Sequence, residues 1–232
     1  MPKIKSYLKI MFFLAAIIGV NTAIATPAKL EKDTTFKNIL ILGNSITRHQ
    51  PAPKLGWYGD WGMAASLRDN DFVHILEKKF KKVYNSAEVH FGTIVPFERG
   101  YWQYDLSQLD SLTSLHPDLI ILRIGENVSN ESVVKHSFGK YYGDLVNYLS
   151  KDNGNVKILC VSSFWKKDEV ASLIAKASNQ RNCYYLKISQ LSEDSSNMAL
   201  GKFENKGVAM HPSDKGMEAI AALIWDKVNL IR

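Results

Sequence analysis

The fold is decided first by residues 38–45, whose sequence is Asn-Ile-Leu-Ile-Leu-Gly-Asn-Ser. The aliphatic residues from Ile39 to Leu42 lack the polar alternation of a strand that has one face in water. Such a run is typical of a strand buried on both faces, which occurs in parallel sheets covered by helices. The glycine and the two short polar residues that follow predict a tight turn at the end of this strand.

Further along the chain, short apolar runs alternate with segments of helical period. The runs predict strands at 38–42, 88–91, 118–124, 156–161 and 184–188. The segments between and after them predict helices at 71–83, 105–115, 138–149, 168–178 and 212–231. Strands that alternate with helices predict an α/β three-layer sandwich with a parallel sheet of about five strands.

The first 25 residues have the layout of a secretory signal peptide. Lys3, Lys5 and Lys9 precede an apolar run, which ends near the small-residue triplet Ala23-Ile24-Ala25. The run is shorter than the roughly 20 residues that span a bilayer. We therefore expect cleavage after Ala25, a secreted or periplasmic protein without a membrane span in its mature form, and one domain over residues 26–232. An uncleaved N-terminal anchor is the alternative.

Charge and cysteine content narrow the class of protein. The net charge is +6, and three of the lysines lie in the first 25 residues, so the mature chain carries only about +3, too little to predict nucleic-acid binding. The two cysteines, Cys160 and Cys183, either form one disulfide or remain buried thiols. No cluster of Cys and His has the spacing of metal ligands, so we expect no metal and no cofactor.

Three loops at the predicted carboxyl edge of the sheet carry the residues that suggest chemistry. They read Gly43-Asn44-Ser45-Ile46-Thr47, Gly125-Glu126-Asn127 and Met210-His211-Pro212. Ligands of open α/β sheets bind at this edge, where the loops after the strands gather. A serine, an amide and a histidine brought together there would supply the nucleophile, the oxyanion donor and the base of acyl transfer.

The same three blocks resemble those of the SGNH (GDSL-type) hydrolases. The resemblance runs from about Asn38 to the C-terminus and implies a flavodoxin-like sheet and ester hydrolysis through an acyl-enzyme. It implies that Ser45 is the nucleophile and His211 the base, and that the Ser45 N–H and the Asn127 side chain bind the oxyanion. Gly92, after the second predicted strand, is the candidate for a third oxyanion donor, with Gly100 as the alternative.

Two positions depart from the family pattern. Asn44 stands where aspartate is common before the nucleophile, a change that we expect to be mild because this residue supports the turn. Val208 stands where the family has the aspartate that orients the histidine, and loss of such an acid costs about 10⁴ in rate in a serine protease. We therefore interpret the site as a Ser–His dyad, oriented by a backbone carbonyl or by another carboxylate. The carboxylates considered are Glu98, Glu126, Glu204 and Asp214.

The loop after Ser45 is rich in aromatic residues. Trp57, Tyr58 and Trp61 either form a stacking wall for a sugar ring or aryl group, or pack the loop onto the domain. Trp102 and Trp165 are further candidates for that wall. Among the other histidines, His49 is a candidate for lining the pocket, whereas His74, His90 and His116 occupy ordinary structural positions.

These features predict a serine esterase that acts on small acyl esters, with an acetyl ester of a carbohydrate as the expected substrate. One alternative is a lysophospholipase or thioesterase, which would need a long apolar acyl channel. Another is a noncatalytic glycan-binding protein on the same fold. A dinucleotide binder is disfavoured because no Gly-x-Gly-x-x-Gly follows the first strand.

Overall fold

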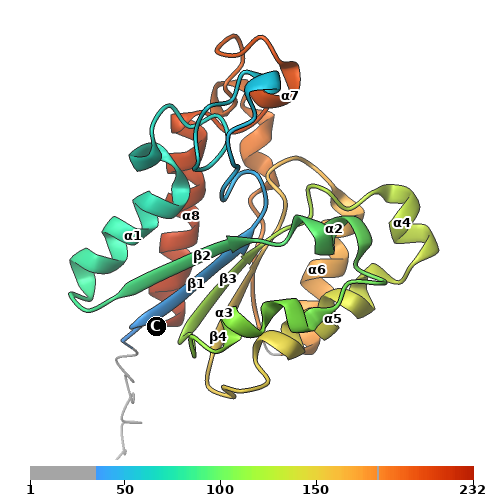
Figure 1. Ribbon diagram of the computed structural model, residues 1–232. Coiled ribbons are helices and arrows are strands. Elements are labelled where there is room, and N and C mark those ends of the chain that lie inside the picture. The colour runs from blue at the N-terminus through green and yellow to red at the C-terminus, as the bar shows by residue number, and fades with distance from the viewer. Residues whose placement is uncertain (1–34, 182) are drawn as a thin grey trace, which may run out of the picture. The chain divides into compact units, whose positions relative to one another are not determined.

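Five parallel strands form one sheet in the computed structural model, which describes residues 35–181 and 183–232 (Figure 1). Their spatial order is β2-β1-β3-β4-β5, and every pair of neighbours is parallel. This order is the flavodoxin-like one, so the predicted fold class is confirmed. The strands are β1 (Asn38–Gly43), β2 (Glu88–Thr93), β3 (Leu119–Arg123), β4 (Lys157–Val161) and β5 (Tyr184–Leu186).

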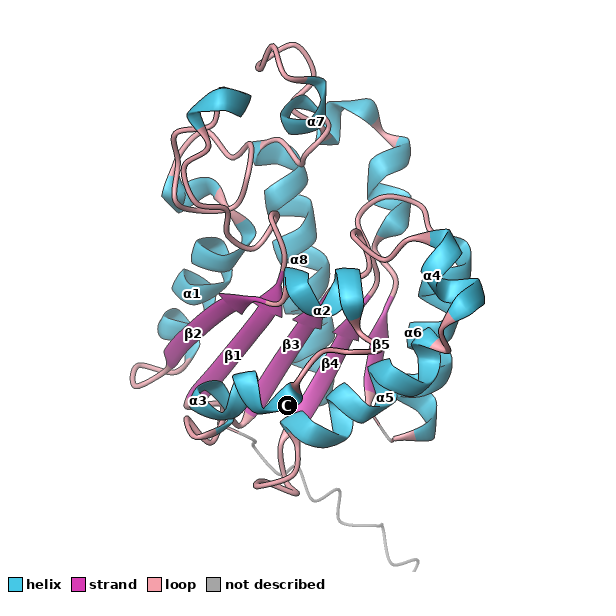
Figure 2. Cartoon of the chain, turned by 45° about the vertical axis from the view of Figure 1, so that its right-hand side comes forward, coloured by secondary structure: helices cyan, strands magenta, loops and turns pink. Residues whose placement is uncertain are grey.

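Helices cover both faces of the sheet (Figure 2). One face packs against α1 (Phe72–Val83) and α8 (Asp214–Ile231), and the other against α5 (Phe138–Leu149) and α6 (Asp168–Gln180). Shorter helices lie in the connections: α2 (Val95–Gly100), α3 (Asp110–Thr113), α4 (Asn130–Lys135) and α7 (Lys206–Ala209). Single 3₁₀ turns occur at Pro53–Leu55, Arg68–Asn70, Leu106–Leu109, Ser189–Glu193 and Ser195–Asn197.

Two of the predicted helices differ from the observed ones. The helix expected at 105–115 is a 3₁₀ turn, Leu106–Leu109, followed by the short α3. Its leucines recur every third residue, which matches the three residues per turn of a 3₁₀ helix better than the period of an α-helix. The last helix begins at Asp214 and not at Pro212, because the Ser213 side chain caps it by accepting the N–H of Gly216.

The burial of β1 on both faces explains why residues 39–42 are all apolar. Successive side chains of a strand point to opposite faces. Ile39 and Ile41 therefore enter the core beneath α1 and α8, while Leu40 and Leu42 enter the core on the opposite side of the sheet. All four side chains are fully buried, and each such burial stabilises the fold by about 1.5–3 kcal/mol.

The chain turns sharply where β1 ends. A Cβ atom at Gly43 would lie 1.9 Å from Thr47 Oγ1 and 3.0 Å from the carbonyl oxygen of Arg123. Only glycine fits this close approach without a shift of its neighbours. Gly43 thus lets the next residues fold back over the carboxyl edge of the sheet, where the loops and α7 gather (Figure 1).

The predicted signal peptide, residues 1–25, lies outside the described residues, and the 26–232 domain boundary stays a prediction. In the part of the chain that the structure describes, no helix combines the length and apolar character needed to cross a membrane. Cys160 and Cys183 are both free thiols, the first buried on β4 and the second just before β5.

Candidate active site

The turn after β1 places Ser45 beside His211. The amides of Thr47 and Arg48 both donate to the carbonyl oxygen of Asn44, at 2.9 and 3.0 Å, which closes the turn around Ser45. Ser45 Oγ then lies 2.9 Å from His211 Nε2, although the two residues are 166 positions apart in the sequence. The structure therefore brings the expected nucleophile and base within hydrogen-bond distance.

A backbone carbonyl holds the other nitrogen of the imidazole. His211 Nδ1 lies 2.7 Å from the carbonyl oxygen of Gly207 in α7. This contact requires a proton on Nδ1, which leaves Nε2 free to accept the hydrogen of Ser45. Burial lowers the pKa of His211, and the Gly207 hydrogen bond opposes that shift in part. The edge of the imidazole also meets the Trp165 ring, with the ring centroids 5.2 Å apart.

The carboxylates considered as partners of His211 lie elsewhere. Asp214 accepts hydrogen bonds from Ser66 and Asn70, and so ties the loop before α1 to α8. Glu204 is exposed, and no described residue forms a hydrogen bond or ion pair with it. Val208 is buried in packing at 1% exposure. Glu98 and Glu126 belong to a separate buried network.

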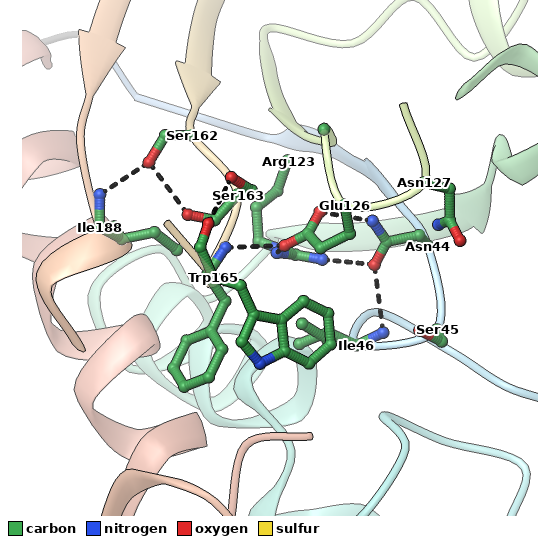
Figure 3. A network of polar contacts seen from close by, with 12 residues as sticks. Asn44, Ser45, Ile46, Arg123, Glu126, Asn127, Ser162, Ser163, Trp165 and Ile188 are labelled. Carbon is green, nitrogen blue, oxygen red and sulfur yellow. Dashed lines mark hydrogen bonds and ion pairs between the residues drawn. The ribbon is translucent and has the colours of Figure 1, made fainter. Parts of the chain in front are cut away.

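That network lies directly beneath the Ser45 turn (Figure 3). Asn44 Nδ2 donates to Glu126 Oε2 at 2.6 Å and to Glu98 Oε1 at 3.2 Å, and Asn44 Oδ1 accepts from Arg123 Nη2 at 2.6 Å. Arg123 Nη1 forms an ion pair of 2.5 Å with Glu126 Oε1, which also accepts the Phe164 amide at 2.7 Å. Asn44, Glu98 and Arg123 are fully buried. The guanidinium thus binds Glu126 and the Asn44 amide oxygen, and the Asn44 amide nitrogen donates to both glutamates.

Glu98 connects this network to Asn127. It accepts the Asn127 side-chain Nδ2 at 2.8 Å and the backbone amides of Gly125 and Asn127 at 2.6 and 3.3 Å. Burial raises the pKa of Glu98, and the charge of Glu126 raises it further, while these hydrogen bonds act in the opposite direction. Gly125 has a φ of +133°, a conformation that favours glycine, and so lets the loop turn back onto Glu98.

Sequence reasoning missed this network. Glu98 and Glu126 were considered only as partners of His211, and Arg123 was not singled out. One signal was present, because an arginine at the end of an otherwise apolar buried strand requires a buried acceptor. Its partners lie 79 positions away at Asn44 and three positions away at Glu126.

A cavity of about 540 Å³ opens at the Ser45–His211 pair. Asn127 lines it, whereas Gly92 does not: Gly92 lies inside β2 opposite Leu42, and the cavity is lined there by Thr93 and Val95. Gly100, the alternative, is buried at the end of α2. The role of Gly92 as an oxyanion donor stays a prediction. The cavity is lined by Ser45, Arg48, His49, Gln50, Leu55, Met63, Thr93, Val95, Arg99, Asn127, Asn205, Gly207, Val208 and His211.

The aromatic loop contributes packing beside this cavity. Trp57 is 3% exposed, its Nε1 donates to the carbonyl of His49, and its ring meets the Trp61 ring edge-on at 5.6 Å. Trp61 is partly buried, and Tyr58 is 74% exposed. None of these three rings lines the cavity. Trp57 forms a small cluster, called here the loop core, whose other buried members are Met63, Ala64, Ala199 and Val208.

Other aromatic and ionisable residues also have defined places. Trp102 stacks on His136 with ring centroids 4.0 Å apart, and neither residue lines the cavity. His74 is buried between Asp71 and Arg68. Across residues 35–181 and 183–232, no group of three or more His, Cys, Asp or Glu side chains is arranged to hold a metal ion.

No family model matches the sequence, and no curated protein matches it either. Solved structures do match the fold. A two-domain esterase described as active on acetylated mannans superposes with a TM-score of 0.56 at 19% identity, over 83% of this chain and 49% of that one. This chain therefore spans about half the length of that esterase.

Two further solved structures match this chain over nearly their whole length. An acetyl xylan esterase gives a TM-score of 0.52 at 18% identity, over 82% of this chain and 99% of that one. A psychrotrophic esterase from Pseudoalteromonas sp. gives 0.52 at 15% identity, over 83% and 97%. At these identities the likeness establishes the fold, and the protein shares the α/β fold of these esterases.

Proposed function

We propose that this protein is a serine esterase in which Ser45 is the nucleophile and His211 the general base. The observation that carries the proposal is the 2.9 Å contact between Ser45 Oγ and His211 Nε2 in the wall of a cavity. A neutral imidazole at this distance can take the hydroxyl proton as the oxygen attacks an ester. The fold shared with solved esterases supports the same activity.

The reaction would proceed in two halves. In the first, Ser45 Oγ bonds to the acyl carbon, its proton moves to His211 Nε2, and that proton passes to the alcohol oxygen as the ester C–O bond breaks. In the second, a water molecule attacks the acyl-enzyme and gives its proton to Nε2, and this proton returns to Ser45 Oγ as the acid leaves. The Gly207 carbonyl keeps the Nδ1 proton in place, so the lone pair of Nε2 faces Ser45 in both halves.

Asn127 and the Ser45 amide are the proposed oxyanion donors. The Asn127 amide has two N–H groups, and one of them is held by Glu98 Oε2. The second remains for the negative oxygen of the tetrahedral intermediate. Because Glu98 accepts only from the nitrogen side of the amide, it also fixes which end of Asn127 faces the cavity. Such pre-set donors stabilise the transition state without reorganisation during the reaction.

The proposed substrate is a short acyl ester, with acetyl expected, of a carbohydrate. Gln50, Thr93 and Asn205 supply neutral hydrogen-bonding groups to the cavity wall, which suit sugar hydroxyls. The apolar lining is limited to Leu55, Met63, Val95 and Val208. That is less than the long channel that a lysophospholipid chain would require. Export through the predicted signal peptide would bring the enzyme to extracellular or periplasmic glycans.

Labelling with a fluorophosphonate and hydrolysis of p-nitrophenyl acetate test the proposal together. Wild-type protein should be labelled and active, whereas Ser45→Ala and His211→Ala should each lose nearly all activity while keeping the wild-type melting temperature. Asn127→Ala should lower kcat by about 10²–10³. Ser86→Ala, in an exposed turn, is the matched serine control. Wild-type protein that neither reacts with the probe nor hydrolyses the ester would point to the noncatalytic glycan-binding alternative.

Separate variants test whether the Gly207 carbonyl, and not a carboxylate, orients His211. Glu204→Gln and Asp214→Asn should each lower kcat less than about tenfold, because neither carboxylate contacts the imidazole and a neutral acceptor leaves no acid to lose. A loss of several hundredfold at either position, with folding unchanged, would show that a carboxylate holds His211 in the working enzyme.

A further inference from the structure

The cavity at Ser45 has cationic lining residues and no acidic ones. Its ionisable lining residues other than the base are Arg48, Arg99 and His49, and none of its lining residues is Asp or Glu. Glu98 and Glu126 do not line the cavity: Glu126 pairs with Arg123 and accepts from Asn44, and Glu98 accepts from Asn44 and Asn127. The side chains that line the cavity are therefore cationic or neutral.

Arg48 does not provide a free charge. Its Nε donates to Asp60 Oδ1 at 2.9 Å and its Nη2 to Asp60 Oδ2 at 2.8 Å. This paired geometry occupies both oxygens of the carboxylate and the Nε–Nη2 edge of the guanidinium. Asp60 itself does not line the cavity. The pair adds almost no net charge to the site.

Arg99 is different, because no residue in the described part of the chain forms a hydrogen bond or ion pair with its side chain. Its side chain is exposed and lines the same cavity as Ser45. Its backbone is nevertheless held firmly, since its neighbours Phe97, Glu98 and Gly100 are buried on the inner face of α2. A fixed helix thus presents one unpaired guanidinium to the cavity.

We infer that Arg99 binds a carboxylate on the sugar part of the substrate, so that the preferred substrate is an acetylated glycan containing uronic acid. This inference rests on the proposed esterase function. A guanidinium matches a carboxylate with two parallel hydrogen bonds. Arg99 and Ser45 line the same cavity of about 540 Å³, a volume within the usual range of ligand sites, so one bound ligand can contact both. The neutral lining residues would bind the hydroxyls of the same sugar.

The test compares kcat/KM on acetylated polygalacturonate oligosaccharides with kcat/KM on acetylated xylan oligosaccharides of the same length. Wild-type enzyme should prefer the acidic substrate by about tenfold or more, as expected for a charged hydrogen-bonded pair, and the preference should shrink as salt is added. Arg99→Gln should reduce the ratio to near one. Arg99→Lys should keep part of it, because the charge remains and the paired geometry is lost.

Lys176→Gln is the matched control, because it removes one exposed positive charge outside this cavity and should leave the substrate ratio unchanged. A wild-type enzyme that hydrolyses p-nitrophenyl acetate through Ser45 but shows no preference for the acidic glycan would overturn the inference and leave the esterase proposal standing. An equal decrease of the substrate ratio in Lys176→Gln would show that the preference arises from the overall charge of the protein and not from Arg99. Absence of Ser45-dependent hydrolysis of any ester would instead refute the proposed function.

Discussion

Asn44→Asp is the sharpest test of the buried network beneath the Ser45 turn. Aspartate is the common residue at this position in the hydrolase family that the sequence resembles, and it differs from asparagine by one non-hydrogen atom. In this protein, however, the Asn44 amide donates to Glu126 at 2.6 Å and to Glu98 at 3.2 Å. An aspartate would replace both donated hydrogen bonds by contacts between carboxylates, with Arg123 as the single cation among three acids.

The expected loss can be worked out from these contacts. Each hydrogen bond to a charged acceptor contributes about 1.5–3 kcal/mol, and leaving a buried charge without its partner costs about 3–5 kcal/mol. Uptake of a proton by the cluster relieves part of this penalty. We therefore expect Asn44→Asp to lower the free energy of unfolding by about 3–5 kcal/mol at pH 8.

The loss of stability in Asn44→Asp should depend on pH. Burial and neighbouring negative charge raise the pKa of a carboxyl in this cluster, as they do for Glu98. A group whose pKa is raised on folding stabilises the folded state below its unfolded pKa, and that stability is lost as the pH rises through the folded pKa. The penalty of Asn44→Asp should therefore be small at pH 5 and grow toward pH 8.

Urea unfolding followed by tryptophan fluorescence at pH 5 and pH 8 measures this difference. Asn85→Asp, in an exposed turn, is the matched control and should change the free energy of unfolding by less than about 0.5 kcal/mol at both pH values. If Asn44→Asp unfolds like the wild type at pH 8, the two glutamates do not depend on the Asn44 amide, and the described network is not what stabilises the turn.

Three further predictions concern the same edge of the sheet. Because burial lowers the pKa of His211, kcat/KM for p-nitrophenyl acetate should fall on the acid side with an apparent pKa below about 6.5; a midpoint above 7 would contradict this. Trp57→Ala should lower the free energy of unfolding by about 3–5 kcal/mol and reduce activity on p-nitrophenyl acetate and on glycan esters alike. A rise in KM for the glycan ester alone, at unchanged melting temperature, would instead support a role of Trp57 in stacking on the sugar. Gly43→Ala should lower the free energy of unfolding by about 1–3 kcal/mol through its contact with Thr47. Gly154→Ala, with no atom within 4 Å of the added Cβ, should be nearly neutral in the same urea unfolding experiment, and equal losses in the two variants would contradict the tight contact at Gly43.

The sheet could be predicted from sequence because its signals are local. Runs such as Ile39 to Leu42 carry their own burial pattern, and a parallel order follows once helices separate the strands. The split of the expected helix at 105–115 also has a local cause, the three-residue spacing of its leucines, but that spacing differs from an α-helical period by less than one residue per turn.

The site was harder to predict because its contacts join distant parts of the chain. Glu98 meets Asn44 over 54 positions and Asn127 over 29, and nothing beside any of these residues indicates the others. The partner of His211 Nδ1 is a backbone carbonyl, which every residue possesses and which leaves no mark in the sequence. The role of Trp57 could not be predicted either, because an aromatic residue in a loop has the same sequence pattern whether it binds a ligand or packs the loop onto the domain.

The loop core has a consequence for how the proposed activity would be lost on heating. Val208 and Trp57 pack together at the carboxyl edge, in a cluster distinct from the two large cores that hold the sheet and helices. A small cluster of this kind can open at a lower free energy than the whole fold. Its opening would release the segment before His211 from the segment after Ser45 while the sheet stays intact. Inactivation would then be a local and reversible event that precedes global melting, and brief cooling would recover activity without refolding of the chain.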